Sequence, residues 1–206
     1  MPPSQAVQRI SIRWLPEPAY EDTDTIALNV GGYFIDLRVV KETGSIQWSR
    51  AGERILLEEN PYLTVPDEAH FEKLPNGDDL EIGSTPCPHK GGALTEYEEV
   101  WRDITSRKQP EDPSWILQSA DGTTFIGRVG TIYLAIRKSE TGNFSARRED
   151  LSSSNQTWEV TFESGKVELL PRASSALKQI GATEKVENGT LQVDDINYIV
   201  KAFSNA

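Results

Sequence analysis

The sequence predicts a mainly β protein, built from two antiparallel β-barrels that arose by internal duplication, with one short α-helix. Three observations support this fold class: apolar residues mostly alternate, glycine and proline interrupt the runs often, and one stretch of sequence recurs. A chain of 206 residues is long enough for two small domains, each with its own hydrophobic core.

Alternating apolar residues predict the strands. In TIALNV (25–30) and YFIDLRVV (33–40), every second residue is apolar and shares one face, and Gly31-Gly32 predicts a bulge or tight turn between them. Further strands are predicted at 46–50, 54–58, 96–103, 114–119, 123–127, 131–138, 144–148, 157–163 and 195–203.

Two shorter signals complete the secondary structure. PRASSALKQIGA (171–182) predicts the helix, because a proline lies near its start, apolar residues follow at helical spacing, and Gly181 is typical of a helix end. ENGT (187–190) contains the Asn-Gly pair that favours a tight β-hairpin.

The internal repeat is the most informative feature. VGGYFIDLRVVKETGSIQWSR (30–50) matches VGTIYLAIRKSETGNFSARR (129–148) with a single gap, so that Arg38 corresponds to Arg137. A single unit of this kind would leave exposed sheet edges, which closure into a barrel removes. The repeat therefore predicts two similar barrels, in domains spanning 1–103 and 104–206.

Four segments carry a family resemblance: GYFIDLR, QWSRAGE, YEEVWRDI and FSARRED. Together they resemble the fungal Hri family, which is named for interaction with a casein kinase, and the resemblance covers nearly the whole chain. It implies two calycin-like (lipocalin-like) barrels and no defined biochemical activity. The chain is short between RILLEEN and FEKLPNGDDLEIG, which predicts an incompletely closed first barrel with room for a pocket.

The charge balance limits the classes of partner that the protein is expected to bind. With 21 basic and 32 acidic residues the net charge is −11, which argues against nucleic acid and against an anionic membrane surface. No apolar run is long enough to cross a bilayer, and the first residues lack the apolar core of a signal peptide. The single cysteine excludes an internal disulfide, and we expect a cytoplasmic protein.

STPCPHKGG (84–92) places the only cysteine near a histidine. Cys87, His89 and His70 are the entire Cys/His supply, and no CxxC or HExxH spacing typical of zinc sites occurs. A catalytic Cys–His pair is the alternative, since both side chains would point the same way in an extended segment, but it would need a third orienting group. The prolines on either side of Cys87 favour a rigid extended loop. We therefore expect a structural loop that binds neither metal nor nucleotide.

Candidate ligand residues come from the alternating strands. YEEVW (97–101) sets two aromatics and Glu99 on one face, where they can bind a polar group or exchange a proton, although an edge strand with a solvated face is the simpler interpretation. Arg38 and Arg137 suit either an anionic ligand or structural salt bridges, and Arg137 is the freer because Ala135 stands where Arg38 has Asp36. The predicted ligand-binding residues are Arg38, Trp48, Tyr97, Glu99, Trp101, Tyr133, Arg137 and Trp158.

Three functions fit these features. The first is a barrel that encloses a small apolar or carbonyl-bearing molecule. The second is a cofactor-independent, pericyclase-like cyclase or isomerase of secondary metabolism, a kind of enzyme that leaves no sequence motif. No GxGxxG, Walker or GxSxG motif occurs in the sequence. We therefore expect no cofactor, and the sequence assigns no catalytic residue. The third is an adaptor for a protein partner such as a casein kinase, as the resemblance implies. A cavity favours the first two functions, and filled barrels with an exposed apolar patch favour the third.

Overall fold

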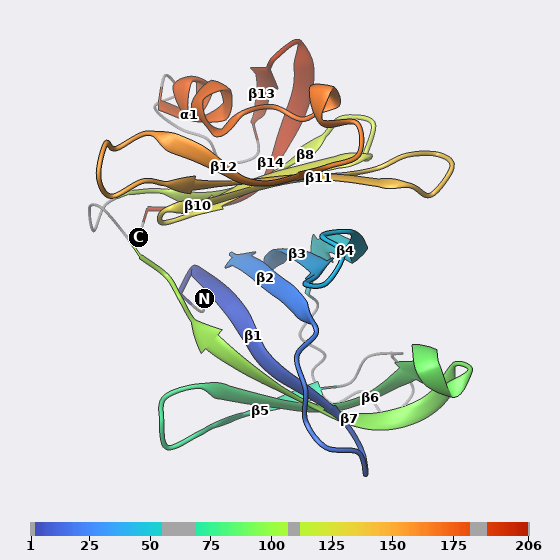
Figure 1. The fold of residues 1–206 in the computed structure, drawn as a ribbon. Coiled ribbons are helices and arrows are strands. Elements are labelled where there is room, and N and C mark those ends of the chain that lie inside the picture. Colours follow the sequence, from blue (N-terminus) through green and yellow to red (C-terminus); the bar gives the residue numbers. More distant parts are fainter. Residues whose placement is uncertain (1–2, 55–68, 107–111, 182–188, 206) are drawn as a thin grey trace.

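The computed structural model describes residues 3–54, 69–106, 112–181 and 189–205. These residues form two seven-stranded antiparallel sheets and one α-helix (Figure 1). The first sheet contains β1 (Gln5–Trp14), β2 (Thr23–Val30), β3 (Tyr33–Val40), β4 (Ile46–Glu53), β5 (Ala69–Lys73), β6 (Asp79–Cys87) and β7 (Ala93–Asp103). The second contains β8 (Ser114–Ser119), β9 (Thr124–Val129), β10 (Ile132–Lys138), β11 (Phe144–Leu151), β12 (Trp158–Ser164), β13 (Thr190–Val193) and β14 (Ile196–Ser204); the helix is α1 (Ala173–Gly181), and short 3₁₀ helices occupy Pro88–Lys90 and Val167–Leu169.

The two sheets have related but not identical strand topologies. Their orders are β4-β3-β2-β1-β7-β6-β5 and β12-β11-β10-β9-β8-β14-β13. In the first sheet four consecutive strands, β1 to β4, are neighbours, and in the second sheet five are, β8 to β12. In each sheet the last strand of the unit returns to pair with the first, as β7 does with β1 and β14 with β8. The predicted repeat segments contain the hairpins β3–β4 and β10–β11, which occupy equivalent places. This agreement supports the duplication; the division into domains at residue 103 stays a prediction.

The expectation of closed barrels is wrong for the strands that the structure describes. Each sheet stays open, with β4 and β5 at the edges of the first and β12 and β13 at the edges of the second. In the second sheet β13 is only four residues long, and α1 packs against it, so a helix fills the opening where closure would need further strand pairing.

The two sheets pack against each other through one apolar face of each. Alternation along β2 and β3 turns one set of side chains toward β8, β9 and β10. This shared core includes Ile26, Leu28, Ile35, Leu37, Ile116, Val129, Leu134 and Ile136. The opposite face of each sheet is its concave face, around which the sheet curves. In Figure 1, β5 and β6 lie across this face from β2 and β3 in the first sheet, and α1 covers it in the second.

The two concave faces differ in chemistry. In the second sheet this face is filled by apolar and aromatic side chains, among them Trp115, Tyr133, Tyr198, Ala176 and Ile180, the last two from α1. In the first sheet it carries buried charged residues and a pocket, described below. Open space on a concave face is therefore found in the first sheet among the described residues.

Most predicted elements are confirmed, including the short helix, and four strands were not predicted. β1 escaped detection because a bulge between Arg9 and Ser11 breaks its alternation, and β5, β6 and β13 are short or half-buried on both sides. The β13–β14 hairpin turns at Asp194–Asp195, with φ of 46° and 65°. Residues 55–58 and 187–188, within two predicted elements, lie outside the described residues. Among the residues that the structure describes, no helix is long and apolar enough to cross a membrane.

Candidate functional site

A buried ion-pair cluster lies on the concave face of the first sheet. Arg9 of β1 donates from Nε to Glu21 Oε2 at 2.8 Å and from Nη1 to Glu99 Oε1 at 2.5 Å. Its Nη2 also donates to Thr23 Oγ1 at 2.9 Å. The side chains of Arg9 and Glu99 are only 2% and 6% exposed, so these charges depend on each other for compensation.

Arg38 joins the same cluster. Its Nη1 donates to Glu99 Oε1 at 3.1 Å, and its Nη2 lies 3.2 Å from Asp36 Oδ2. The guanidinium also stacks 4.1 Å from the ring centroid of Trp48. The structure thus brings together three predicted residues, Arg38, Trp48 and Glu99, in salt bridges and stacking contacts rather than around an open space.

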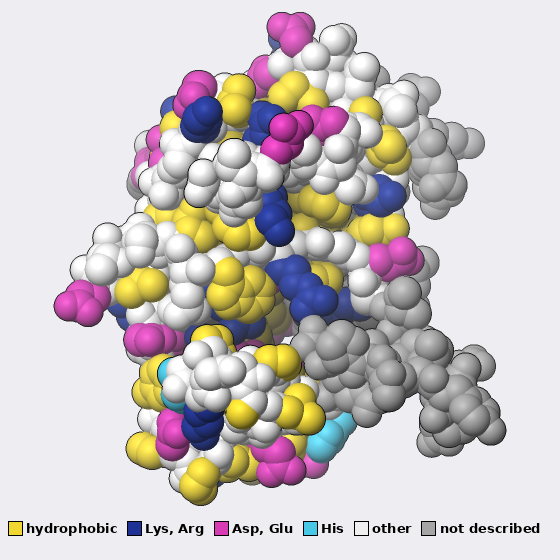
Figure 2. Space-filling view, turned by 90° about the vertical axis from the view of Figure 1, so that its right-hand side faces the viewer, with side chains coloured by type: hydrophobic (Ala, Val, Ile, Leu, Met, Phe, Trp, Pro, Cys, Tyr) yellow, Lys and Arg dark blue, Asp and Glu magenta, His cyan; other side chains and the backbone are white. Residues whose placement is uncertain are grey.

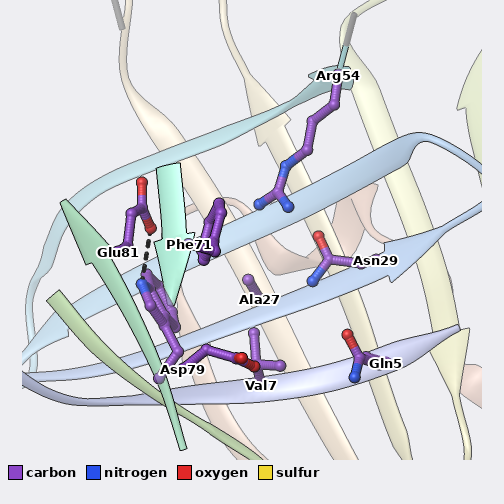
Figure 3. A pocket seen from close by; sticks show the side chains of 9 residues that line it. Gln5, Val7, Ala27, Asn29, Arg54, Phe71, Asp79 and Glu81 are labelled. Carbon is purple, nitrogen blue, oxygen red and sulfur yellow. Dashed lines mark hydrogen bonds between the residues drawn. The ribbon is translucent and has the colours of Figure 1, made fainter. Parts of the chain in front are cut away.

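A pocket of about 190 Å³ opens beside this cluster (Figure 3). It lies between β1 and β2 on one side and β5, β6 and β7 on the other. Its volume is below the range of roughly 300–1,000 Å³ typical of drug-sized ligands, so it suits a smaller molecule. Its lining residues are Gln5, Val7, Ala27, Asn29, Arg54, Phe71, Asp79, Glu81 and Trp101.

Glu81 is a half-buried carboxyl group at the wall of this pocket. Tyr97 donates its hydroxyl to Glu81 Oε1 at 2.9 Å, and Trp101 donates Nε1–H to Oε2 at 2.8 Å. Burial raises the pKa of Glu81, the negative charge of Glu99 acts in the same direction, and these effects outweigh the two hydrogen bonds. Tyr97, Glu99 and Trp101 do share one buried face of β7, but the carboxyl group that lines the pocket belongs to β6, which the sequence did not reveal.

The pKa of Glu81 predicts how stability changes with pH. A carboxyl group whose pKa is higher in the folded chain contributes stability below its ordinary pKa of 4.5, and that contribution is lost as the pH rises through the folded pKa. We therefore expect Glu81→Gln to gain stability relative to the wild type as the pH rises from 4.5. Urea unfolding of both proteins over a pH series measures this difference; Glu149, whose pKa burial also raises, is common to both and cancels. Parallel pH profiles would contradict the assignment.

Three of the predicted residues lie in the second sheet, away from the pocket. Tyr133 is fully buried and donates its hydroxyl to the carbonyl oxygen of Pro171 at 2.9 Å. Trp158 is half-buried, with the Arg128 guanidinium 5.7 Å from its ring centroid. Both therefore have packing partners within the second half of the chain.

Arg137 lines a separate cleft of about 250 Å³ at the junction of the two sheets. Arg50, Ala51, Lys138 and Phe144 also line it. On the face shown in Figure 2, Lys and Arg side chains gather at the waist between the sheets, beside hydrophobic side chains. The structure thus separates Arg137 from Trp101 and Glu99, with which the sequence grouped it.

The Cys87–His89 loop is packed rather than open. Cys87 is fully buried against Ile12, Trp14 and Tyr97. Its Sγ lies 3.4 Å from His89 Nδ1 and 3.5 Å from Nε2, and His89 Nε2 lies 3.3 Å from Glu17 Oε2. The segment is structured but is not the extended loop that the sequence predicts, because Cys87 ends β6 and Pro88–Lys90 form a 3₁₀ helix. Whether it binds metal in solution stays a prediction.

Two open antiparallel sheets, packed back to back, with one concave face filled and the other holding a polar pocket, define a two-unit, barrel-like β protein. The family model described as Protein HRI1 matches residues 5–200, and the chain belongs to this family. No curated protein sequence matches the chain. The fold is similar to the crystal structure of an uncharacterized protein from Saccharomyces cerevisiae, with a TM-score of 0.70 and 16% identity over 98% of this chain and 99% of that one.

Proposed function

We propose that the protein binds a small molecule in the pocket on the concave face of the first sheet. The observation that carries this proposal is the contrast between the two sheets. The second sheet fills its concave face with its own helix and aromatic side chains, whereas the equivalent region of the first leaves about 190 Å³ open. A fold that closes one of two similar units and leaves the other open is suited to binding in the open one.

The chemistry of the pocket walls supports this proposal. Aromatic rings line it from two strands: Phe71, which is 54% exposed, and Trp101. Asn29 Oδ1 is buried and accepts no hydrogen bond from any residue that the structure describes. A buried acceptor without a donor is costly, so a ligand group that donates to it would be favoured. The walls thus combine aromatic rings with several polar and charged groups, which can fix the orientation of a bound molecule.

A cofactor-independent isomerase or cyclase is a second candidate, and Glu81 favours it. A carboxyl group with a raised pKa, hydrogen-bonded by Tyr97 and Trp101 at the wall of a pocket, is suited to donate or accept a proton from a bound carbonyl compound. Cys87 is a buried free thiol. Thiols stay reduced in the cytoplasm, which agrees with the proposal that this calycin-like protein of fungal type works there.

Filling the pocket tests the proposal. Ala27 lines the pocket and is 2% exposed, so Ala27→Leu places additional methyl groups in the open space without changing charge. We expect wild-type protein to bind at least one member of a panel of small carbonyl-bearing and carboxylated metabolites, measured by isothermal titration calorimetry, and Ala27→Leu to bind none.

The matched control is Ala51→Leu, which makes the same change in the cleft beside Arg137. This variant should bind as the wild type does. Loss of binding in Ala51→Leu but not in Ala27→Leu would move the site to the other cleft. Absence of binding to every panel member would leave the adaptor function, with a protein partner such as a casein kinase, as the better account.

A further inference from the structure

One cationic side chain that lines the pocket has no salt-bridge partner among the residues that the structure describes. Three ionisable residues line the pocket: Arg54, Asp79 and Glu81. Asp79 Oδ1 lies 2.7 Å from Lys73 Nζ, which offsets its charge. Glu81 accepts hydrogen bonds from two neighbours, and burial makes it hold its proton more firmly than an exposed glutamate does. Arg54 is the remaining member, and its positive charge acts against burial to lower the pKa of Glu81 without forming a salt bridge with it.

Arg54 forms no salt bridge with any residue in the described part of the chain. Its guanidinium lies 5.2 Å from the ring centroid of Phe34, a contact that leaves its N–H groups available. Figure 3 shows it extending from the end of β4 into the pocket, toward Phe71 and Asn29. Most other arginines lie within salt-bridge distance of a carboxylate: Arg9, Arg13, Arg38, Arg102, Arg128, Arg147, Arg148 and Arg172.

The negative charges nearest the pocket are compensated too. Glu99, next to Glu81 on the concave face, is held by both Arg9 and Arg38. An anion that enters the pocket therefore meets a guanidinium that has no salt bridge within the described part of the chain, and carboxyl groups that are paired or hydrogen-bonded. The guanidinium is a local positive charge in a chain whose overall charge is −11.

From this arrangement we infer that the pocket selects a small organic anion, a carboxylate or phosphate ester whose charged group binds Arg54 and whose flat apolar body lies between Phe71 and Trp101. The guanidinium of an arginine matches both groups because it donates two parallel N–H bonds. Aromatic walls favour a planar apolar body. This inference rests on the proposed function, because it concerns the ligand of the same pocket.

Four probes of one shape test the inference: benzoate, phenyl phosphate, benzyl alcohol and benzylamine. We expect the wild type to bind one of the two anions at least tenfold more tightly than the neutral alcohol, as charge-assisted hydrogen bonds allow. Benzylamine should bind most weakly. Comparison of benzoate with phenyl phosphate identifies which anionic group the pocket prefers. Isothermal titration calorimetry at one fixed salt concentration measures all four affinities.

Arg54→Gln and its matched control, Arg50→Gln, assign the effect. Both arginines are exposed and both lie near the Phe34 ring, but only Arg54 lines this pocket. We expect Arg54→Gln to weaken anion binding about tenfold or more and to leave benzyl alcohol unaffected, and Arg50→Gln to match the wild type.

Two results separate the possible failures. If benzyl alcohol binds the wild type as tightly as the anions do, or Arg54→Gln binds anions as the wild type does, the anion inference is overturned while the proposed small-molecule site stands. If neither these probes nor any member of the metabolite panel binds, the proposed function fails and this inference fails with it.

Discussion

Replacing Arg9 with methionine is expected to lower the free energy of unfolding by about 3–5 kcal/mol. The change leaves Glu21 without its guanidinium partner and leaves Glu99 with Arg38 alone, on a face of the sheet that water hardly reaches. Removing one partner of a buried ion pair lowers the free energy of unfolding by more than the intact pair contributes to it, because the remaining charge stays buried without a partner. Chemical denaturation of the wild type and Arg9→Met, monitored by tryptophan fluorescence, measures the loss.

Arg13→Met is the control for this prediction. Arg13 lies on the same strand and pairs with Glu98 at 3.2 Å, but its side chain is 41% exposed. An exposed pair of this kind contributes at most about 1 kcal/mol, so this variant should stay close to the wild type. Equal losses in the two variants would show that the Arg9 cluster is not the buried electrostatic centre of the first sheet.

The second large effect is expected in the second sheet. Trp115→Ala should lower the free energy of unfolding by about 3–5 kcal/mol, because the ring is fully buried among Leu117, Ile126 and the side chains of α1. Removing the Trp115 ring leaves a cavity on the concave face of the second sheet, the face that holds the pocket in the first sheet. Thermal or urea unfolding checks the size of the loss.

Trp158→Ala provides the comparison. Trp158 packs against the same core but is only half-buried, so its loss should be clearly smaller. If Trp115→Ala cost no more than Trp158→Ala, the concave face of the second sheet would not be filled as tightly as the structure indicates, and the contrast between the two sheets would lose its basis.

The fold was largely predictable because alternation and the repeat are local signals. The repeat segments at 30–50 and 129–148 each form a hairpin at the same place in the topology, as predicted. Closure was not predictable from these signals, because it depends on whether the last strands meet. In the second sheet α1 packs against the edge strand β13, and the sheet stays open. No pattern within either segment reveals this contact.

The candidate site was predictable only in part. Tyr97, Glu99 and Trp101 were grouped correctly because they alternate on one strand. Glu81 and Phe71 were missed because their strands lack a regular pattern: β6 is half-buried almost throughout, and β5 is exposed at every position. Arg54 lies just beyond β4, and only the curvature of the sheet brings it opposite Glu81.

The indole N–H signals of the five tryptophans offer the most direct test of the claim that the first sheet, and not the second, binds a ligand. In a ¹H–¹⁵N spectrum, with the signal of Trp101 assigned from Trp101→Phe, the panel compound that binds best would be added to saturation. The account predicts that the Trp101 signal shifts, because its N–H contacts Glu81 at the pocket wall, while Trp115 and Trp158 stay in place. A shift confined to Trp115 or Trp158, with Trp101 unchanged, would contradict it.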